Sequence, residues 1–164
     1  MTSWFKTLLV GAAILGAAPA AAQTVPLSME VRLDAGIPVQ DSDDVLDTGV
    51  GFGVRAMLDL APTFAVYAGY SRFDFELDED LGDGDVEEDG FELGGRVGLG
   101  YGHGAAQPYV LLGALFHDDD TGLEAGLGAD YPVSWNLSVT PEVKYRTVND
   151  TDYLALGLGA RFRF

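Results

Sequence analysis

The chain has 164 residues and no cysteine, and its 26 acidic against 9 basic side chains leave a formal net charge of −17. This length suits one domain, the absence of cysteine excludes disulfides and thiolate metal sites, and the charge argues against nucleic acid, which proteins bind through Lys and Arg. With 48% hydrophobic and 11% aromatic residues, the chain also differs from acidic disordered chains, which are poor in both.

Residues 1–22 have the pattern of a cleaved secretory signal peptide. Lys6 supplies a positive charge, the run Thr7 to Ala18 is uncharged and largely apolar, and Ala20-Ala21-Ala22 offers a small-residue cleavage site. The apolar run is shorter than the ~20 residues that a membrane-spanning helix needs. We therefore expect cleavage rather than a retained anchor, and a mature domain of residues 23–164.

In the mature domain, apolar side chains recur at every second position, which is the period of a β-strand. Eight such runs follow one another, each with one apolar face and one face of polar residues and glycine; they lie at residues 28–37, 49–60, 64–75, 91–100, 109–116, 123–131, 137–146 and 154–164. The facing of the third run is the least clear. Its apolar side is expected to consist of Phe64, Val66, Ala68 and Tyr70.

The connections between the runs alternate in character. After the second, fourth and sixth runs they are short or neutral, whereas after the first, third, fifth and seventh they are polar and mostly acidic. Transmembrane barrels have this asymmetry, with short periplasmic turns and longer extracellular loops. The pattern predicts an all-β fold, an eight-stranded antiparallel up-and-down transmembrane β-barrel with short periplasmic turns and longer acidic extracellular loops.

Glycine crowds the polar face of the runs, and this argues for a membrane barrel over a soluble one. Glycine weakens a strand and usually marks a place that another group approaches closely, and the interior of an eight-stranded barrel is barely wide enough for its own side chains. We therefore expect the polar face to line the interior. Its charges must be paired there, and seven acids and seven bases predict an ion-pair network of Glu30, Arg32, Asp34, Arg55, Asp59, Glu92, Arg96, Glu124, Asp130, Glu142, Lys144, Arg146, Arg161 and Arg163.

Two segments resemble the OmpA-like outer-membrane β-barrel family. Leu154 to Phe164, which ends in Phe162-Arg163-Phe164, is similar to the terminal strand by which outer-membrane barrels are recognised for assembly, and Gln107 to Ala114 is similar to the family's Pro-Tyr-x-x-x-Gly strand. The resemblance implies the Gram-negative outer membrane, contact with its lipid and lipopolysaccharide, and insertion by the barrel-assembly machinery through Phe164. Because the family includes membrane-stabilising proteins, adhesins and virulence factors, it selects no single activity and no oligomeric state.

Nineteen acidic residues lie outside the predicted interior, ten of them between Asp74 and Asp89. The simplest interpretation is a solvated, repulsive rim. The sharper hypothesis is a Ca²⁺ site, because Ca²⁺ takes six to eight oxygen ligands and this stretch offers many at close spacing, although Arg96 stands where an EF-hand loop would need Glu. The candidate ligands are Asp78, Asp80, Asp83, Asp85, Glu87 and Asp89.

The sequence also raises three alternatives to a structural or surface-interaction role. His117 beside Asp118 could belong to a barrel enzyme acting on lipopolysaccharide, but neighbouring strand residues point to opposite faces and no serine stands at a suitable spacing as nucleophile, so no catalytic residue is expected. A narrow channel is disfavoured because eight strands leave no open lumen. A soluble periplasmic lipocalin-like barrel would bury the apolar faces and expose glycine and charge. Apart from possible Ca²⁺ at the loops, no cofactor is expected.

Overall fold

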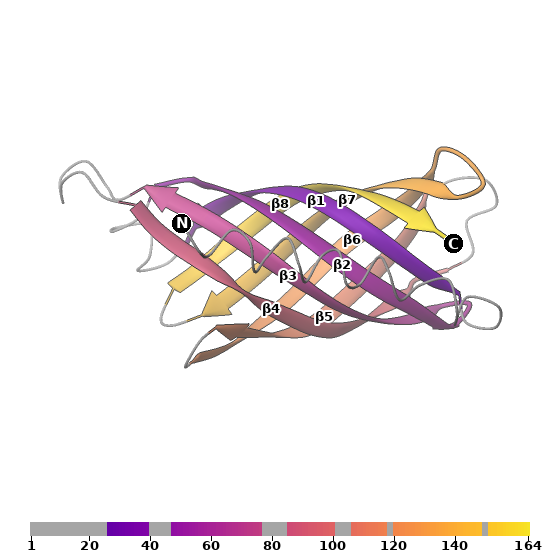
Figure 1. Ribbon diagram of the computed structural model, residues 1–164, viewed down its shortest axis with the longest axis horizontal. Helices are drawn as coiled ribbons and strands as arrows, with labels where there is room; N and C mark the ends of the chain where they lie inside the picture. Colours follow the sequence, from indigo (N-terminus) through magenta and orange to yellow (C-terminus); the bar gives the residue numbers. More distant parts are fainter. Residues whose placement is uncertain (1–25, 40–46, 77–84, 101–105, 118–119, 149–150) are drawn as a thin grey trace, which may run out of the picture.

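Eight antiparallel strands form a closed barrel, which confirms the predicted fold class (Figure 1). The computed structural model describes residues 26–39, 47–76, 85–100, 106–117, 120–148 and 151–164. The strands are β1 (Leu27–Pro38), β2 (Gly49–Ala61), β3 (Phe64–Glu76), β4 (Asp85–Gly98), β5 (Gln107–His117), β6 (Asp120–Pro132), β7 (Leu137–Val148) and β8 (Thr151–Arg163). Each strand pairs with its neighbours in the chain, and β1 closes the barrel against β8. Within the described ranges, no helix is long and apolar enough to cross a membrane.

The two ends of the barrel differ in their connections. At the terminal end, β1 begins and β8 ends; at the loop end, β1 connects to β2, β3 to β4, β5 to β6 and β7 to β8. Two of the loop-end connections are as short as turns, because only residues 118–119 separate β5 from β6 and only 149–150 separate β7 from β8. The connections at the two ends therefore differ more clearly in their content of acidic residues than in their length.

The β3–β4 hairpin extends further into the acidic stretch than the sequence predicted. The fourth run was expected to begin at residue 91, but β4 begins at Asp85, and Asp74 pairs with Glu87 in the β3–β4 register. The inward positions of this extension explain its strand form, because Phe73 and Phe75 are both buried. A strand that buries aromatic side chains on one face can carry charge on the other.

The outward face of the barrel is apolar along its middle. Leu33, Leu112 and Leu158 are 71%, 69% and 58% exposed, although leucine is normally a core residue. On β3, Phe64 is exposed whereas Tyr67 is buried, so the predicted facing of this strand is confirmed. Leucine on the outside and charge on the inside invert the usual arrangement of a soluble barrel.

Glycine makes room for large side chains inside the barrel, as the sequence predicts. A Cβ atom added at Gly69 would lie 2.8 Å from Cγ of Arg55, and one added at Gly126 would lie 2.9 Å from Cγ of Lys144. Glycine makes room for aromatic side chains in the same way, since a Cβ at Gly51 would lie 2.6 Å from the Phe73 ring. Inner glycines therefore accommodate both the long cations and the rings that fill the lumen.

Candidate functional site

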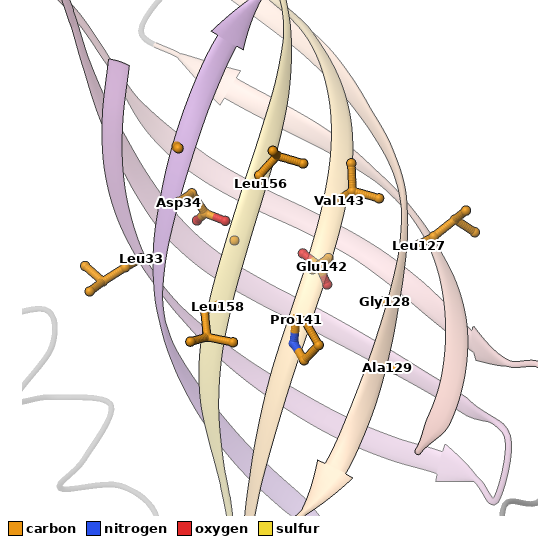
Figure 2. Close-up of a pocket in the computed structure, with 12 residues that line it drawn as sticks. Leu33, Asp34, Leu127, Gly128, Ala129, Pro141, Glu142, Val143, Leu156 and Leu158 are labelled. Atoms are coloured by element: carbon orange, nitrogen blue, oxygen red, sulfur yellow. The ribbon is translucent and has the colours of Figure 1, made fainter. Parts of the chain in front are cut away.

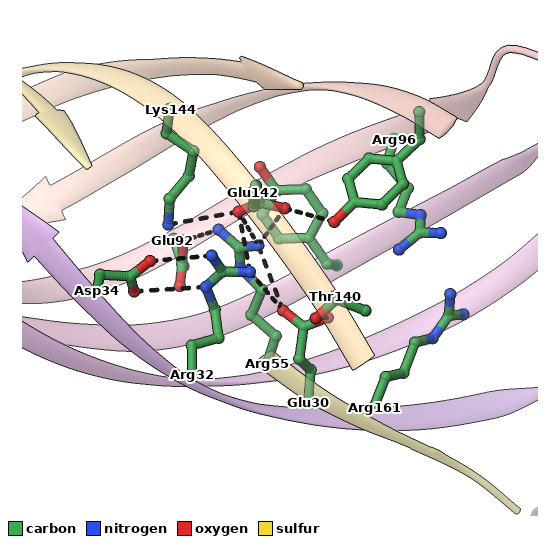
Figure 3. A network of polar contacts seen from close by, with 12 residues as sticks. Glu30, Arg32, Asp34, Arg55, Glu92, Arg96, Thr140, Glu142, Lys144 and Arg161 are labelled. Carbon is green, nitrogen blue, oxygen red and sulfur yellow. Dashed lines mark hydrogen bonds and ion pairs between the residues drawn. The ribbon is translucent and has the colours of Figure 1, made fainter. Parts of the chain in front are cut away.

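Nine charged side chains from five strands meet in the middle of the barrel. Figure 3 shows the part of this group around Arg32, Arg55 and Glu142. All are at most 6% exposed, which is unusual because charged groups are rarely buried without partners. They alternate with outward apolar residues along each strand, so the strand period alone turns them inward. We refer to Glu30, Arg32, Asp34, Arg55, Glu92, Glu124, Glu142, Lys144 and Arg146 as the central cluster.

Arg32 joins the carboxylates of β1 to one on β7. Its guanidinium lies 2.7 Å from Glu30, 2.9 Å from Asp34 and 3.0 Å from Glu142. Glu30 and Asp34 stand two positions to either side of Arg32 on the same inward face of β1. One cation is therefore surrounded by three acceptors, an arrangement that satisfies several guanidinium donors at once.

Two further arginines tie the opposite walls of the barrel together. Arg55 on β2 lies 2.9 Å from both Glu92 on β4 and Glu142 on β7. Arg146 on β7 lies 3.0 Å from Glu92 and 2.9 Å from Glu124. The two Arg55 pairs and the Arg146–Glu92 pair join strands that are not neighbours in the barrel, so they cross-link it through its lumen. Glu124 instead lies opposite Arg146 on the adjacent strand.

Three neutral side chains donate further hydrogen bonds to the buried carboxylates. The Tyr67 hydroxyl donates to Glu124 at 2.6 Å, the Tyr109 hydroxyl donates to Glu142 at 2.8 Å, and the Thr140 hydroxyl donates to Glu30 at 3.0 Å. The sequence pattern did not single out these residues. Their inward position on the strands is the signal that could have found them, since a hydroxyl on the polar face of a barrel strand must meet interior acceptors.

Lys144 is held differently from the arginines. Its Nζ atom lies 3.6 Å from Glu142 and 3.9 Å from Glu124, and it makes no hydrogen bond to a protein atom of the described residues. Buried polar groups without such a partner are rare. Lys144 therefore contributes positive charge to the centre without fixing a particular geometry.

A second group of charges lies toward the terminal end. Asp130 accepts hydrogen bonds from Arg96 and from Arg161, the latter at 3.1 Å. Arg161 also lies 2.7 Å from Asp59, and Arg163 lies 3.8 Å from Asp130. We refer to these five residues as the mouth cluster. The fourteen predicted residues thus form two groups, five acids with four bases in the centre and two acids with three bases at the mouth.

Tyr109 connects the two groups. The guanidinium carbon of Arg96 lies 3.8 Å from the centre of its ring, which is close enough for a cation–π contact. On its other side, the Tyr109 hydroxyl donates to Glu142. The charges are therefore continuous from the mouth to the centre through one buried aromatic side chain.

The loop end of the lumen is filled by the rings of Phe73, Phe75 and Tyr153, which pack together with Ala155. We refer to the three rings as the aromatic cluster. Ring centres in this cluster lie 5.1 to 5.9 Å apart, within the range of favourable aromatic contacts. Arg146 lies beneath it, 5.2 Å from the centre of the Phe73 ring. The aromatic cluster therefore stands between the central charges and the loop end.

Glu88 lies at the edge of the aromatic cluster. Its outward neighbours Glu87 and Asp89 are charged, so this part of β4 lies beyond the apolar band that faces lipid. Burial raises the pKa of Glu88 to about 7, while a hydrogen bond with Tyr153 and the charge of Arg146 act in the opposite direction. Glu88 is therefore a carboxyl group that titrates near neutral pH.

The predicted Ca²⁺ ligands are only partly within the described residues. Asp78, Asp80 and Asp83 lie outside them, and Asp85 is described only by its backbone position at the start of β4. Glu87 pairs with Arg72, and Asp89 accepts a hydrogen bond of 2.6 Å from Tyr70. No group of three His, Asp or Glu side chains suited to a metal ion occurs in the part of the chain that the structure describes.

A shallow apolar depression lies on the outward face over β6, β7, β8 and β1 (Figure 2). Leu33, Leu127 and Leu158 surround Pro141, while Asp34 lies behind the strands and points into the lumen. Val133 donates its backbone N–H to the carbonyl of Leu137, so odd-numbered residues of β7 turn their peptide groups toward β6. Pro141 has no N–H to donate there, which removes one hydrogen bond from the β6–β7 ladder.

Solved structures with similar folds include barrels of the bacterial surface and outer membrane. Ail, the attachment invasion locus protein of Yersinia pestis, in complex with the heparin analogue sucrose octasulfate, is 16% identical with a TM-score of 0.62 over 85% of this chain and 99% of that one. Neisserial surface protein A is 12% identical with a TM-score of 0.62 over 84% and 97%. The N-terminal β-barrel domain of Pseudomonas aeruginosa OprF is 16% identical with a TM-score of 0.58 over 84% and 97%. At these identities the likeness shows the fold alone.

The sequence itself matches a family profile over nearly its whole length. The profile of the outer membrane protein beta-barrel domain covers residues 8–164. Comparison with curated proteins finds no match. Given the profile match and the closed barrel with its apolar exterior, the chain belongs to the outer membrane protein beta-barrel domain family and is an eight-stranded barrel of the outer membrane.

Proposed function

We propose that the protein is a non-conducting anchor in the outer membrane that displays an acidic surface outside the cell, with a structural or surface-interaction role. The observation that carries this proposal is the filled lumen. Arg32, Arg146 and Arg161 are among the largest fully buried side chains of the molecule, and they occupy the space through which a solute would have to pass. Removing one partner of such a buried pair leaves an uncompensated charge, which costs about 3–5 kcal/mol.

The outward residues of the two ends support the proposed orientation. At the terminal end, Trp135 is 88% exposed and Phe164 is 64% exposed, as expected of an aromatic girdle at a lipid–water interface. At the loop end, the outward face of the β3–β4 hairpin instead carries charges that pair with one another, including Arg72 with Asp74 and Glu87. We assign the terminal end to the periplasm and the loop end to the cell exterior, and residues 1–22 to a cleaved export signal.

Single cysteines test the orientation and the surface display directly, because the chain has none of its own. Asp47→Cys places a thiol on an exposed residue at the loop end, and the matched variant Val133→Cys places one on an exposed residue in the β6–β7 turn. A membrane-impermeant maleimide should label intact cells carrying the Asp47 variant. It should label the Val133 variant only after the outer membrane is permeabilised. The reverse pattern would mean that the barrel has the opposite orientation, and it would contradict the proposed display of the acidic surface outside the cell.

The proposed role involves no catalytic activity of the protein. His117 is the last residue of β5 and lies opposite Asp120 in the β5–β6 register. Purified protein should leave lipid A and peptide substrates unchanged, as judged by mass spectrometry. Conversion of either substrate, lost in the His117→Ala variant, would make the protein an enzyme.

A further inference from the structure

A cavity of about 630 Å³ opens at the terminal mouth of the barrel. Its inner wall is polar and includes Arg96, Arg161 and Arg163 with Asp130. Its outer rim is apolar and includes Phe64 on β3. A site that is polar within and apolar at its rim matches a ligand with a polar head and a hydrocarbon body.

Arg163 is the member of the mouth cluster with donors to spare. It is 37% exposed, and its Nη2 atom lies 3.8 Å from Asp130, beyond hydrogen-bonding distance. The Asp130 carboxylate already accepts from Arg96 and Arg161. Asp59, the other acid of the cluster, lies 2.7 Å from Arg161. The mouth cluster therefore has three bases for two acids, in a protein whose overall charge is −17.

The guanidinium group favours one chemical class of ligand. Its planar fork matches the oxygens of phosphate and binds them through two parallel hydrogen bonds. On the rim of the same cavity, Leu60 is 59% exposed and Phe64 is 40% exposed, and both face outward toward the lipid. A phosphate at Arg163 would thus have apolar surface next to it on the side where hydrocarbon chains lie.

We propose that the mouth of the barrel binds the phosphate of a phospholipid headgroup, with Arg163 as the principal contact and the acyl chains lying over Leu60 and Phe64. The assignment to lipid of the periplasmic leaflet rests on the orientation in the proposed function. A free phosphate ester shares the headgroup's chemistry but lacks the chains, so the apolar rim would contribute nothing to its binding.

The test is lipid binding by the full mature barrel, refolded and delipidated in a neutral detergent and measured by native mass spectrometry. The probes are phosphatidylglycerol, diacylglycerol with the same chains, and glycerol 3-phosphate. Arg163→Gln should lower retention of phosphatidylglycerol by about fivefold, which corresponds to about 1 kcal/mol. The matched control is Arg72→Gln at the loop end, where the arginine is similarly exposed (31%); it should retain the lipid as the parent does.

The same probes separate a lipid site from a free-phosphate site. Phe64→Ala should weaken phosphatidylglycerol but leave glycerol 3-phosphate unchanged. Equal retention of diacylglycerol and phosphatidylglycerol, or an unaltered Arg163→Gln variant, would overturn the proposal, as would glycerol 3-phosphate binding as tightly as the lipid. A changed mobility of unheated protein on a detergent gel verifies that each variant is folded. Reversed labelling on cells would refute the orientation and the leaflet assignment without altering this binding result.

Discussion

The loop end and the terminal end of the lumen are closed by different chemistry. At the loop end, three aromatic rings pack against one another above the central cluster. At the terminal end, charged side chains surround a cavity of about 630 Å³, and Arg163 remains 37% exposed. One end therefore excludes water by packing, whereas the other admits it. Between the two ends, the buried ion pairs cross-link the walls of the barrel. Closure of the lumen therefore does not depend on either end alone.

The largest expected effect comes from breaking the centre that separates the two ends. Arg55→Met should lower the free energy of unfolding by about 3–5 kcal/mol, because Glu92 and Glu142 lose their shared buried partner. Urea unfolding in lipid vesicles measures this free energy of unfolding. The control Arg72→Met removes the exposed ion pairs with Asp74 and Glu87 and should cost at most about 1 kcal/mol. Equal losses in the two variants would mean that the central pairs contribute no more than surface ones.

Removing an aromatic ring should weaken the loop end specifically. Phe75 is 0% exposed, and Phe75→Ala should cost about 3 kcal/mol through lost burial and the cavity left behind. Proteolysis of the folded barrel reports which end loosens. Faster cleavage at the loop-end connections, with unchanged cleavage near the terminal end, is expected. Uniform cleavage would show that the two ends are not independent.

Added methyl groups should distinguish the tightly packed end from the open one. A Cβ at Gly51 would lie 2.6 Å from the Phe73 ring, whereas a Cβ at Gly98 would find no atom closer than 3.7 Å. Gly51→Ala should therefore cost about 1–3 kcal/mol by overpacking, and Gly98→Ala should be close to neutral. The temperature at which the folded band disappears from an unboiled gel compares them. A neutral Gly51→Ala variant would contradict close packing at the loop end.

The smallest effect is a pH dependence confined to the loop end. Because burial raises the pKa of Glu88 from 4.5 to about 7, the folded state binds this proton more tightly than the unfolded chain does. Its contribution to stability is fully present below pH 4.5 and is lost as pH rises to about 7. Glu88→Gln should remove that part of the dependence from a pH series of unfolding curves. A variant with the parent's pH profile would show that Glu88 is not the titrating group.

The strand period alone predicted much of this architecture, but not its division into regions. Alternation placed Arg55 inward and Leu33 outward, because a barrel strand has only two faces. It could not show that Arg96 belongs with Asp130 while Arg55 belongs with Glu142, since pairing across a lumen depends on strand tilt and register. The aromatic cluster was missed for a similar reason: Phe73 and Phe75 stand on an inward face that was expected to be polar.

The extent of the β3–β4 hairpin also lay beyond the sequence pattern. The run of acids from Asp74 to Asp89 has the composition of a loop, and backbone pairing of Asp74 with Glu87 depends on the buried rings beside it. The hypothesis of a Ca²⁺ site in this stretch stays a prediction. Addition of millimolar Ca²⁺ should slow proteolysis of the hairpin and raise the melting temperature of the protein. No change in either would contradict the hypothesis of a Ca²⁺ site.

The most direct test of the central claim is the conductance of the purified barrel in a planar lipid bilayer. The filled lumen, with Arg55 and Arg146 both bound to Glu92 across it and the aromatic cluster above them, predicts no steady ion current at any moderate voltage. The protein must shift its mobility between unheated and boiled samples, so that the barrel under test is folded. A steady, large conductance from folded protein would show that the ion pairs leave an open path and would contradict the account.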